Sequence, residues 1–189
     1  MGSRGFPVAR CGVSLAVLVA AVLAQRTPSA AAPSPLGSWR SHGQPLRVVV
    51  IALSPENVRA FYDKVGYPKT ATDSIVDTCV FGTVLRNVST RSLSYDIARW
   101  RAVTPDGVSH ALLTKNDWLR RWAAAGVTAD WSLLPPAQRL DIGDWGQGFT
   151  TVALPRHARF DLVYSWSQHG TIRQARISGV RCAADLAAP

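Results

Sequence analysis

The stretch LDIGDWGQGFTTVALPRHARFDLVYSW, from Leu140 to Trp166, carries the clearest fold signal in the chain. Three glycines, Gly143, Gly146 and Gly148, precede a run of β-forming residues. A dinucleotide-binding loop needs the spacing G-x-G-x-x-G between a strand and a helix, whereas here the spacing is G-x-x-G-x-G and a strand follows. We therefore predict a β-hairpin turn in which the glycines supply positive φ angles.

The second half of the stretch alternates apolar and polar side chains. Phe160, Leu162, Tyr164 and Trp166 fall at every second position, so they lie on one face of an extended chain. This pattern predicts a half-buried strand that packs its aromatic face on a core.

Other segments extend this β pattern. Residues 45–53 (PLRVVVIAL) are apolar on both faces and predict a buried central strand. The alternation over residues 93–102 slips by one position, which predicts a β-bulge near Ala98. Two short helices are expected, one from a Ser54 cap to a stop at Gly66 and one from an Asn116 cap to Gly126.

The stretch 140–166 resembles the closing half of immunoglobulin-like modules exported by bacteria. In those modules the sequence contains, in order, a strand, a glycine turn, a second glycine, an apolar strand that ends in Leu-Pro, and a strand in which apolar and polar residues alternate. The segment FGTVLRNVSTRSLSYDIARW (Phe81–Trp100) matches an earlier pair of strands more loosely. The resemblance implies a mainly β fold, an antiparallel immunoglobulin-like β-sandwich. The two short helices expected above depart from those modules and would be helical insertions, which leaves the strand topology open. Such modules share no catalytic residues.

The N-terminal residues predict export. Arg4 and Arg10 precede the apolar run CGVSLAVLVAAVLA (Cys11–Ala24), and small residues follow. The run is shorter than the ~20 residues that a membrane span needs, so we expect a cleaved signal peptide over residues 1–24, with cleavage as late as residue 32. The mature protein would then be periplasmic or secreted, without a transmembrane anchor. A flexible linker over residues 25–43 and a single domain over residues 44–189 are expected to follow.

Two cysteines remain after such cleavage, Cys79 and Cys182. An exported chain with two cysteines most simply forms one disulfide. Neither cysteine has a neighbouring cysteine or histidine that would complete a metal site, so we predict a structural bridge between them.

The net charge bears on which kinds of molecule the protein could bind. The formal net charge is +9. No run of basic residues exceeds two, which favours solubility as the reason for this charge, and the partner expected for such a protein is a protein or an anionic envelope component. No nucleic-acid-binding motif is present, and export would remove the chain from nucleic acid.

One tryptophan and arginine cluster is a candidate binding surface. Trp118 and Trp122 are four residues apart and so share a helix face, with Arg120 and Arg121 beside them. Trp145 stands at the predicted glycine turn. Core packing explains the two helical tryptophans, whereas a partner surface or stacking on a sugar ring would use them directly, since tryptophan and arginine are favoured in interface hot spots.

The sequence carries no signature of catalysis or of a cofactor. Neither a G-x-S-x-G elbow nor an S-x-x-K motif occurs, and the histidines lack metal-binding spacing. We therefore expect an exported, non-catalytic module that acts by binding and uses no cofactor. Two alternatives stay open: a periplasmic metal or small-ligand carrier that uses His110, His157 or His169, and an uncharacterised periplasmic enzyme.

Overall fold

The computed structural model describes Gly2 and residues 37–184. Apart from Gly2, the leader predicted over residues 1–24, its cleavage positions and most of the linker predicted over residues 25–43 lie outside the described residues. The described part of that linker contains a short strand, Ser38–Arg40, so regular structure begins before residue 44. The strand forms where Trp39 packs against the core.

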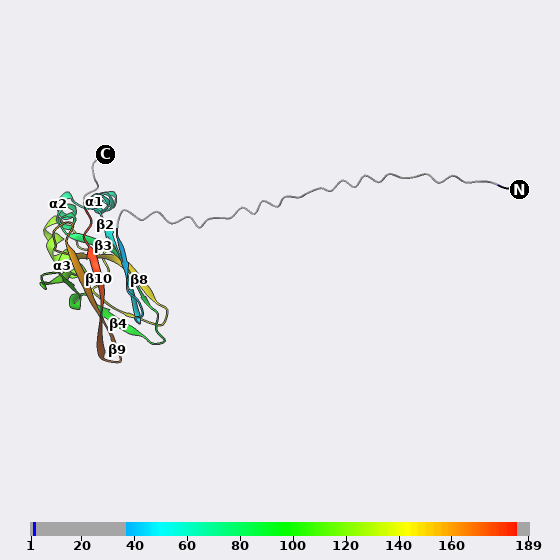
Figure 1. The fold of residues 1–189 in the computed structure, drawn as a ribbon. Coiled ribbons are helices and arrows are strands. Elements are labelled where there is room, and N and C mark those ends of the chain that lie inside the picture. The colour runs from blue at the N-terminus through cyan, green and yellow to red at the C-terminus, as the bar shows by residue number, and fades with distance from the viewer. Residues whose placement is uncertain (1, 3–36, 185–189) are drawn as a thin grey trace. The chain divides into compact units, whose positions relative to one another are not determined.

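Within residues 37–184 the fold is mainly β (Figure 1). Its ten strands are β1 (Ser38–Arg40), β2 (Leu46–Leu53), β3 (Cys79–Asn87), β4 (Leu93–Asp96), β5 (Arg101–Val103), β6 (Ser109–Leu113), β7 (Ala137–Leu140), β8 (Trp145–Val152), β9 (Arg159–Gln168) and β10 (Thr171–Arg181). The helices are α1 (Pro55–Lys64), α2 (Lys69–Val76) and α3 (Lys115–Trp122), with 3₁₀ turns η1 (Ile97–Arg99) and η2 (Ala123–Ala125).

The named strands pair only in the antiparallel sense and join into one sheet. Strand β6 pairs through its first residues with β5 and through its last residues with β8, so the sheet folds over along β6. We call β1, β2, β3 and β8 layer A, and β4, β5, β7, β9 and β10 layer B. The predicted mainly β, antiparallel class is confirmed.

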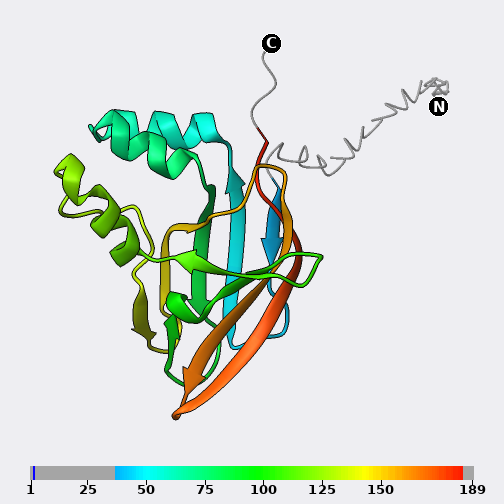
Figure 2. The ribbon, with the colours of Figure 1, turned by 90° about the vertical axis from the view of Figure 1, so that its left-hand side faces the viewer.

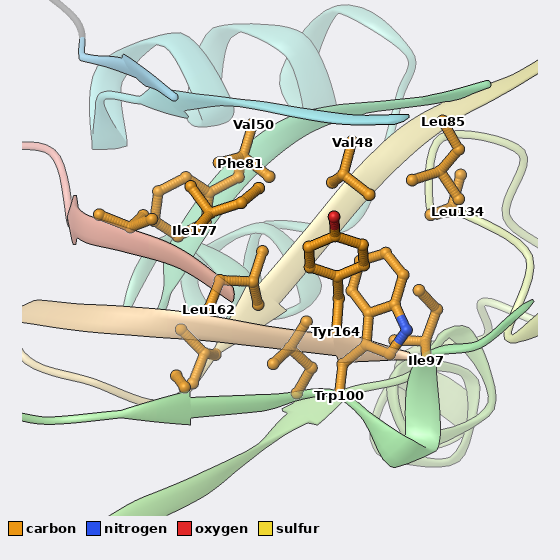
Figure 3. Packing of buried hydrophobic residues seen from close by; sticks show 14 of the residues in the cluster. Val48, Val50, Phe81, Leu85, Ile97, Trp100, Leu134, Leu162, Tyr164 and Ile177 are labelled. Carbon is orange, nitrogen blue, oxygen red and sulfur yellow. The ribbon is translucent and has the colours of Figure 1, made fainter. Parts of the chain in front are cut away.

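The two layers face each other across the main hydrophobic core (Figure 3). Val48, Val50 and Leu85 of layer A point toward Leu162 and Tyr164 of layer B. The alternation predicted along β9 is confirmed, because Phe160, Leu162, Tyr164 and Trp166 are all buried. Full burial of one such side chain contributes about 1.5–3 kcal/mol, so this core is the main source of stability.

The helices pack on the outer face of layer A, at one end of the strands (Figure 2). Their apolar side chains form a second core around Leu53 and Val80, which point out of layer A. Helix α1 begins as predicted, because Ser54 Oγ accepts a hydrogen bond from Asn57 N and Pro55 takes the first position. None of the helices within residues 37–184 is long and apolar enough to cross a membrane.

Three helices are present where two were predicted. Helix α2 lacks a side-chain cap, and its sequence KTATDSIV is poor in strong helix formers. It forms because Ala71, Ile75 and Val76 are buried in the second core. Helix α3 starts earlier than predicted, because Thr114, not Asn116, caps it in a capping box with Asp117.

The predicted disulfide is present. Cys79 opens β3 in layer A, and Cys182 directly follows β10 in layer B, with their Cα atoms 5.2 Å apart. Both residues are buried. The bridge therefore joins the two layers beside the helices, and it indicates an oxidising environment outside the cytoplasm.

The glycine-rich turn differs from the prediction. Only Gly143 has a positive φ angle, whereas Gly146 and Gly148 lie within β8. The strands on either side do not pair with each other, because β7 pairs with β4 in layer B and β8 pairs with β3 in layer A. The turn is therefore no hairpin. It carries the chain from one layer to the other.

Two predictions about single strands have different outcomes. A break in the β pattern near Ala98 is confirmed, but it is the 3₁₀ turn η1 between β4 and β5, both of which pair with β9, and not the predicted β-bulge. Strand β2 is not buried on both faces. Its residues alternate between buried and half-exposed or exposed positions, since no element covers most of the outer side of layer A.

Candidate binding surface

Trp118 and Trp122 belong to the second core and not to the surface. Both are buried, and both indole N–H groups donate inside the protein, Trp118 Nε1 to Thr151 Oγ1 at 2.7 Å and Trp122 Nε1 to Ser74 Oγ at 2.9 Å. The structure thus contradicts a surface role for these two side chains. The physical reason is that α3 needs an apolar face to pack on layer A.

Arg120 and Arg121 are exposed on α3, and neighbours on the helix engage both. Arg120 pairs with Asp117, and the Arg121 guanidinium lies over the Trp118 ring, 5.2 Å from its centroid. Trp145 lies elsewhere. It is six residues along β8 from Thr151, which Trp118 contacts, and six strand residues span about 20 Å. The five predicted residues therefore do not form one patch.

A different surface is left open by the helices. Most outward side chains of layer A beyond the second core are half-exposed or exposed, and Phe149 marks the border, because its ring also contacts Phe61 of α1. We call this surface the open face; it comprises Arg40, Arg47, Val49, Ile51, Gly82, Val84, Arg86, Trp145, Gln147 and Phe149.

The centre of the open face is apolar. Val49 lies opposite Val84, and Ile51 lies opposite Gly82, which in turn lies opposite Phe149. These side chains are half-exposed or exposed. Because Gly82 has no side chain, the space between Ile51 and Phe149 on the neighbouring strands is left unfilled. Such a run of neighbouring exposed apolar residues marks an interaction site more often than an ordinary surface.

Arginines border this apolar centre. Arg47 and Arg86 are cross-strand neighbours, and Arg86 also lies opposite Trp145, which is 60% exposed. Arg40 lies opposite Val49 on the short strand β1. No carboxylate occupies an outward position of β1, β2, β3 or β8, so the open face is positively charged.

A tryptophan that the sequence did not single out extends this surface. Trp131 is 72% exposed, and its ring lies 5.6 Å from Phe61, whose ring lies 5.0 Å from Phe149. The three rings thus lead from the open face to the helices. Trp131 lies in a bend outside the named strands, directly after the turn-favouring Asp130.

A buried polar network holds the segment that presents Trp131. The Asp130 carboxylate accepts hydrogen bonds from Tyr67 Oη (2.6 Å), Leu133 N (2.7 Å) and Ser132 Oγ (2.9 Å). Tyr62 Oη bonds Ser132 Oγ at 2.8 Å. Burial raises the pKa of both phenols, so they remain protonated donors. Every group in the network has a partner, and it serves to anchor the loop.

The candidate metal ligands are dispersed. His157 precedes β9 and His169 follows it, so the two lie about 30 Å apart along a ten-residue strand. His110 lies on β6. Within residues 37–184, no three His, Cys, Asp or Glu side chains are close enough to hold a metal ion together. The metal-carrier alternative therefore has no ligand set among these histidines.

No family model matches this chain, and no curated protein matches it. The candidate surface therefore stands on its own geometry, an apolar centre on layer A bordered by arginines and extended by two exposed tryptophans.

Proposed function

We propose that this protein is a non-catalytic binding module, and that the open face is where it binds a protein partner. The observation that carries the proposal is the exposed apolar centre of layer A with arginines and tryptophan at its border. A protein partner that carries acidic residues around an apolar centre would complement this surface.

The composition of the open face supports a protein partner. Tryptophan and arginine are enriched in interface hot spots, and charged residues are depleted from the centre of interfaces. Val49, Ile51, Val84 and Phe149 supply such a centre, and the charges lie outside it. Strands hold these residues in a fixed register, so a partner would meet a preformed surface.

The compartment is part of the proposal. The disulfide and the apolar N-terminal run support export to the periplasm or the medium. The resemblance to exported immunoglobulin-like modules supports a scaffold role, in which the two-layered β fold presents a surface and performs no chemistry.

Site-specific photocrosslinking tests the proposal. A photoreactive amino acid is placed at Gln147, an exposed residue of the open face, in cells that produce the protein with its native partners. The matched control places it at Gln174, an exposed residue of β10 in layer B. We expect a discrete protein adduct from position 147 and none from position 174.

A second variant separates binding from folding. Val49→Asp in the Gln147-labelled protein puts a negative charge in the apolar centre and should abolish the adduct, while the thermal unfolding midpoint changes little because Val49 is half-exposed. Equal adducts from both labelled positions, or an adduct that survives Val49→Asp, would contradict the proposal.

A further inference from the structure

Four turns meet at the end of the molecule opposite the helices. Val88 N donates to Pro45 O at 2.9 Å, and Gln168 Nε2 donates to Ser89 Oγ at 3.3 Å. The Asn87 side chain donates to the carbonyls of Arg91 and Asp141. We call this region the turn end; its turns span residues 41–45, 88–92, 141–144 and 169–170.

The turn end exposes apolar side chains. Eight large apolar residues are exposed within residues 37–184, and four of these, Val88, Ile142, Trp145 and Ile172, lie in its turns or within two residues of them. Ile142 is 64% exposed at the tip of its turn. These side chains protrude singly from separate turns, so they form no flat patch.

The turn end is also positively charged. Arg91 lies in one turn, Arg139 lies two residues before another, and Arg40, Arg47 and Arg86 end the adjoining strands. The acidic residues of the four turns are Asp141 and Asp144, and both are engaged. Hydrogen bonds from Ser92 and then from Arg139 lower the pKa of Asp141, which stays ionised and neutralises Arg139. Asp144 accepts from Asp141 N.

Arg91 has no carboxylate partner among the described residues. Its Nη1 lies 3.2 Å from His169 Nε2 at the tip of the β9–β10 hairpin. A guanidinium can only donate, so the His169 ring nitrogen acts as an acceptor and supplies no negative charge in this contact. The charge of Arg91 therefore remains available to an anion outside the protein.

We propose that the turn end docks on the surface of an anionic phospholipid bilayer. The arginines face the headgroups, and Ile142 and Ile172 enter the interface from the turn tips. Trp145 lies beside them, and tryptophan favours the level of the headgroups. This surface shares Arg40, Arg47, Arg86 and Trp145 with the border of the open face, but it does not include the apolar centre of that face, where the partner protein would bind.

The shape of the turn end favours lipid over an acidic protein. A protein interface buries a packed core of neighbouring apolar residues, whereas these side chains stand on separate convex tips. The chain enters at Gly37 and leaves after Cys182 at the helix end, where Gly37 O accepts from Ala52 N and Cys182 bonds Cys79.

Co-sedimentation with vesicles tests the proposal. The full-length protein, with its disulfide intact, is mixed with phosphatidylcholine vesicles and with vesicles that also contain phosphatidylglycerol. We expect binding to the anionic vesicles that weakens as salt is added. Arg91→Ser should weaken it about fivefold, the usual effect of one arginine near an anionic surface. Ile142→Ser should weaken it by a similar factor of about five, because a partly buried side chain is lost.

A matched double variant controls for charge and apolarity. Arg91→Ser/Ile142→Ser should bind about 25-fold more weakly, as the product of the two effects. Arg159→Ser/Val108→Ser removes one exposed arginine and one exposed aliphatic side chain away from the turn end, and should change binding less than about twofold. All variants carry the same N-terminal segment, so its contribution to vesicle binding is the same for every variant.

Three outcomes would overturn the proposal: equal binding to both kinds of vesicle, equal losses in the two double variants, or a protein adduct from a photoreactive residue at Thr90 that disappears in Arg91→Ser. The last result would assign the turn end to a protein. Crosslinking from Gln147 in the same samples reports on the open face separately, so failure of one proposal is distinguishable from failure of the other.

Discussion

Replacing Gly148 with alanine places a methyl group where another segment of backbone already lies. A Cβ atom at this position would stand 2.5 Å from Leu134 N, 2.7 Å from Leu134 Cα and 2.9 Å from Leu133 C. Carbon atoms pack at about 3.5–4.0 Å, so the segment must retreat by roughly 1 Å. Gly148 has no positive φ angle, so the cost is steric and does not arise from backbone conformation.

The retreat would break the contacts that fix this segment on β8. Leu134 N donates to Phe149 O at 2.9 Å, and Phe149 N donates to Ser132 O at 2.7 Å. Each hydrogen bond contributes about 0.5–1.5 kcal/mol net, and overpacking costs about 1–3 kcal/mol. Alanine recovers roughly 0.5–1 kcal/mol over glycine in a strand. We therefore expect Gly148→Ala to lower the free energy of unfolding by about 3 kcal/mol.

Gly146→Ala is the matched control, on the same strand and the same face. Its Cβ atom would meet nothing closer than Gln138 Oε1 at 3.7 Å, an ordinary contact. This variant should be as stable as the wild type or more stable by up to about 0.5–1 kcal/mol. Urea unfolding, followed by tryptophan fluorescence, measures both variants at constant m-value. Equal stabilities for the two variants would refute the reasoning, because it rests on the close approach at one glycine only.

Three further changes test the two cores and the loop. Reducing the Cys79–Cys182 bridge should lower stability by up to about 4–5 kcal/mol in the chain-entropy model, and melting with and without dithiothreitol measures this; an unchanged midpoint would show that the bridge adds nothing. Trp118→Ala should lower the free energy of unfolding by about 3–5 kcal/mol, whereas Trp145→Ala should lower it by less than about 0.5 kcal/mol. Chemical denaturation of the two variants measures both values. A larger loss for Trp145→Ala would show that Trp145, and not Trp118, is the core residue. Asp130→Ala leaves two hydroxyls and one backbone N–H without their acceptor and should cost about 3 kcal/mol, with hydrogen exchange as the site-specific check; unaltered protection of the loop would contradict this.

Local signals in the sequence predicted the features that depend on local physics. Ser54 and Pro55 fix the start of α1 through a cap and a preset φ angle, and both act within one helical turn. The slip near Ala98 is visible because alternation has a fixed period. The disulfide followed from counting cysteines, since two of the three cysteines, Cys79 and Cys182, remain after the predicted cleavage.

Features that depend on pairing between distant parts of the chain could not be predicted from the sequence. The turn at residues 141–144 reads like a hairpin, and only the partners of β7 and β8 reveal that it crosses between layers. The close approach at Gly148 involves a segment that pairs with β8 irregularly. Helix α2 follows from packing and not from propensity. The open face emerges only when the register of four strands is known, because its residues come from separate parts of the chain.

The position of the disulfide gives the two ends of the domain different mechanical strengths. A pull on the chain beyond Cys182 passes through the bridge to Cys79 and so into β3, which is held by β2 on one side and β8 on the other. A pull on the chain before Ser38 acts first on the three-residue strand β1, which is held by three pairs with β2 and by the packing of Trp39 on the core. A tether at the carboxyl end would therefore bear load that one at the amino end would not.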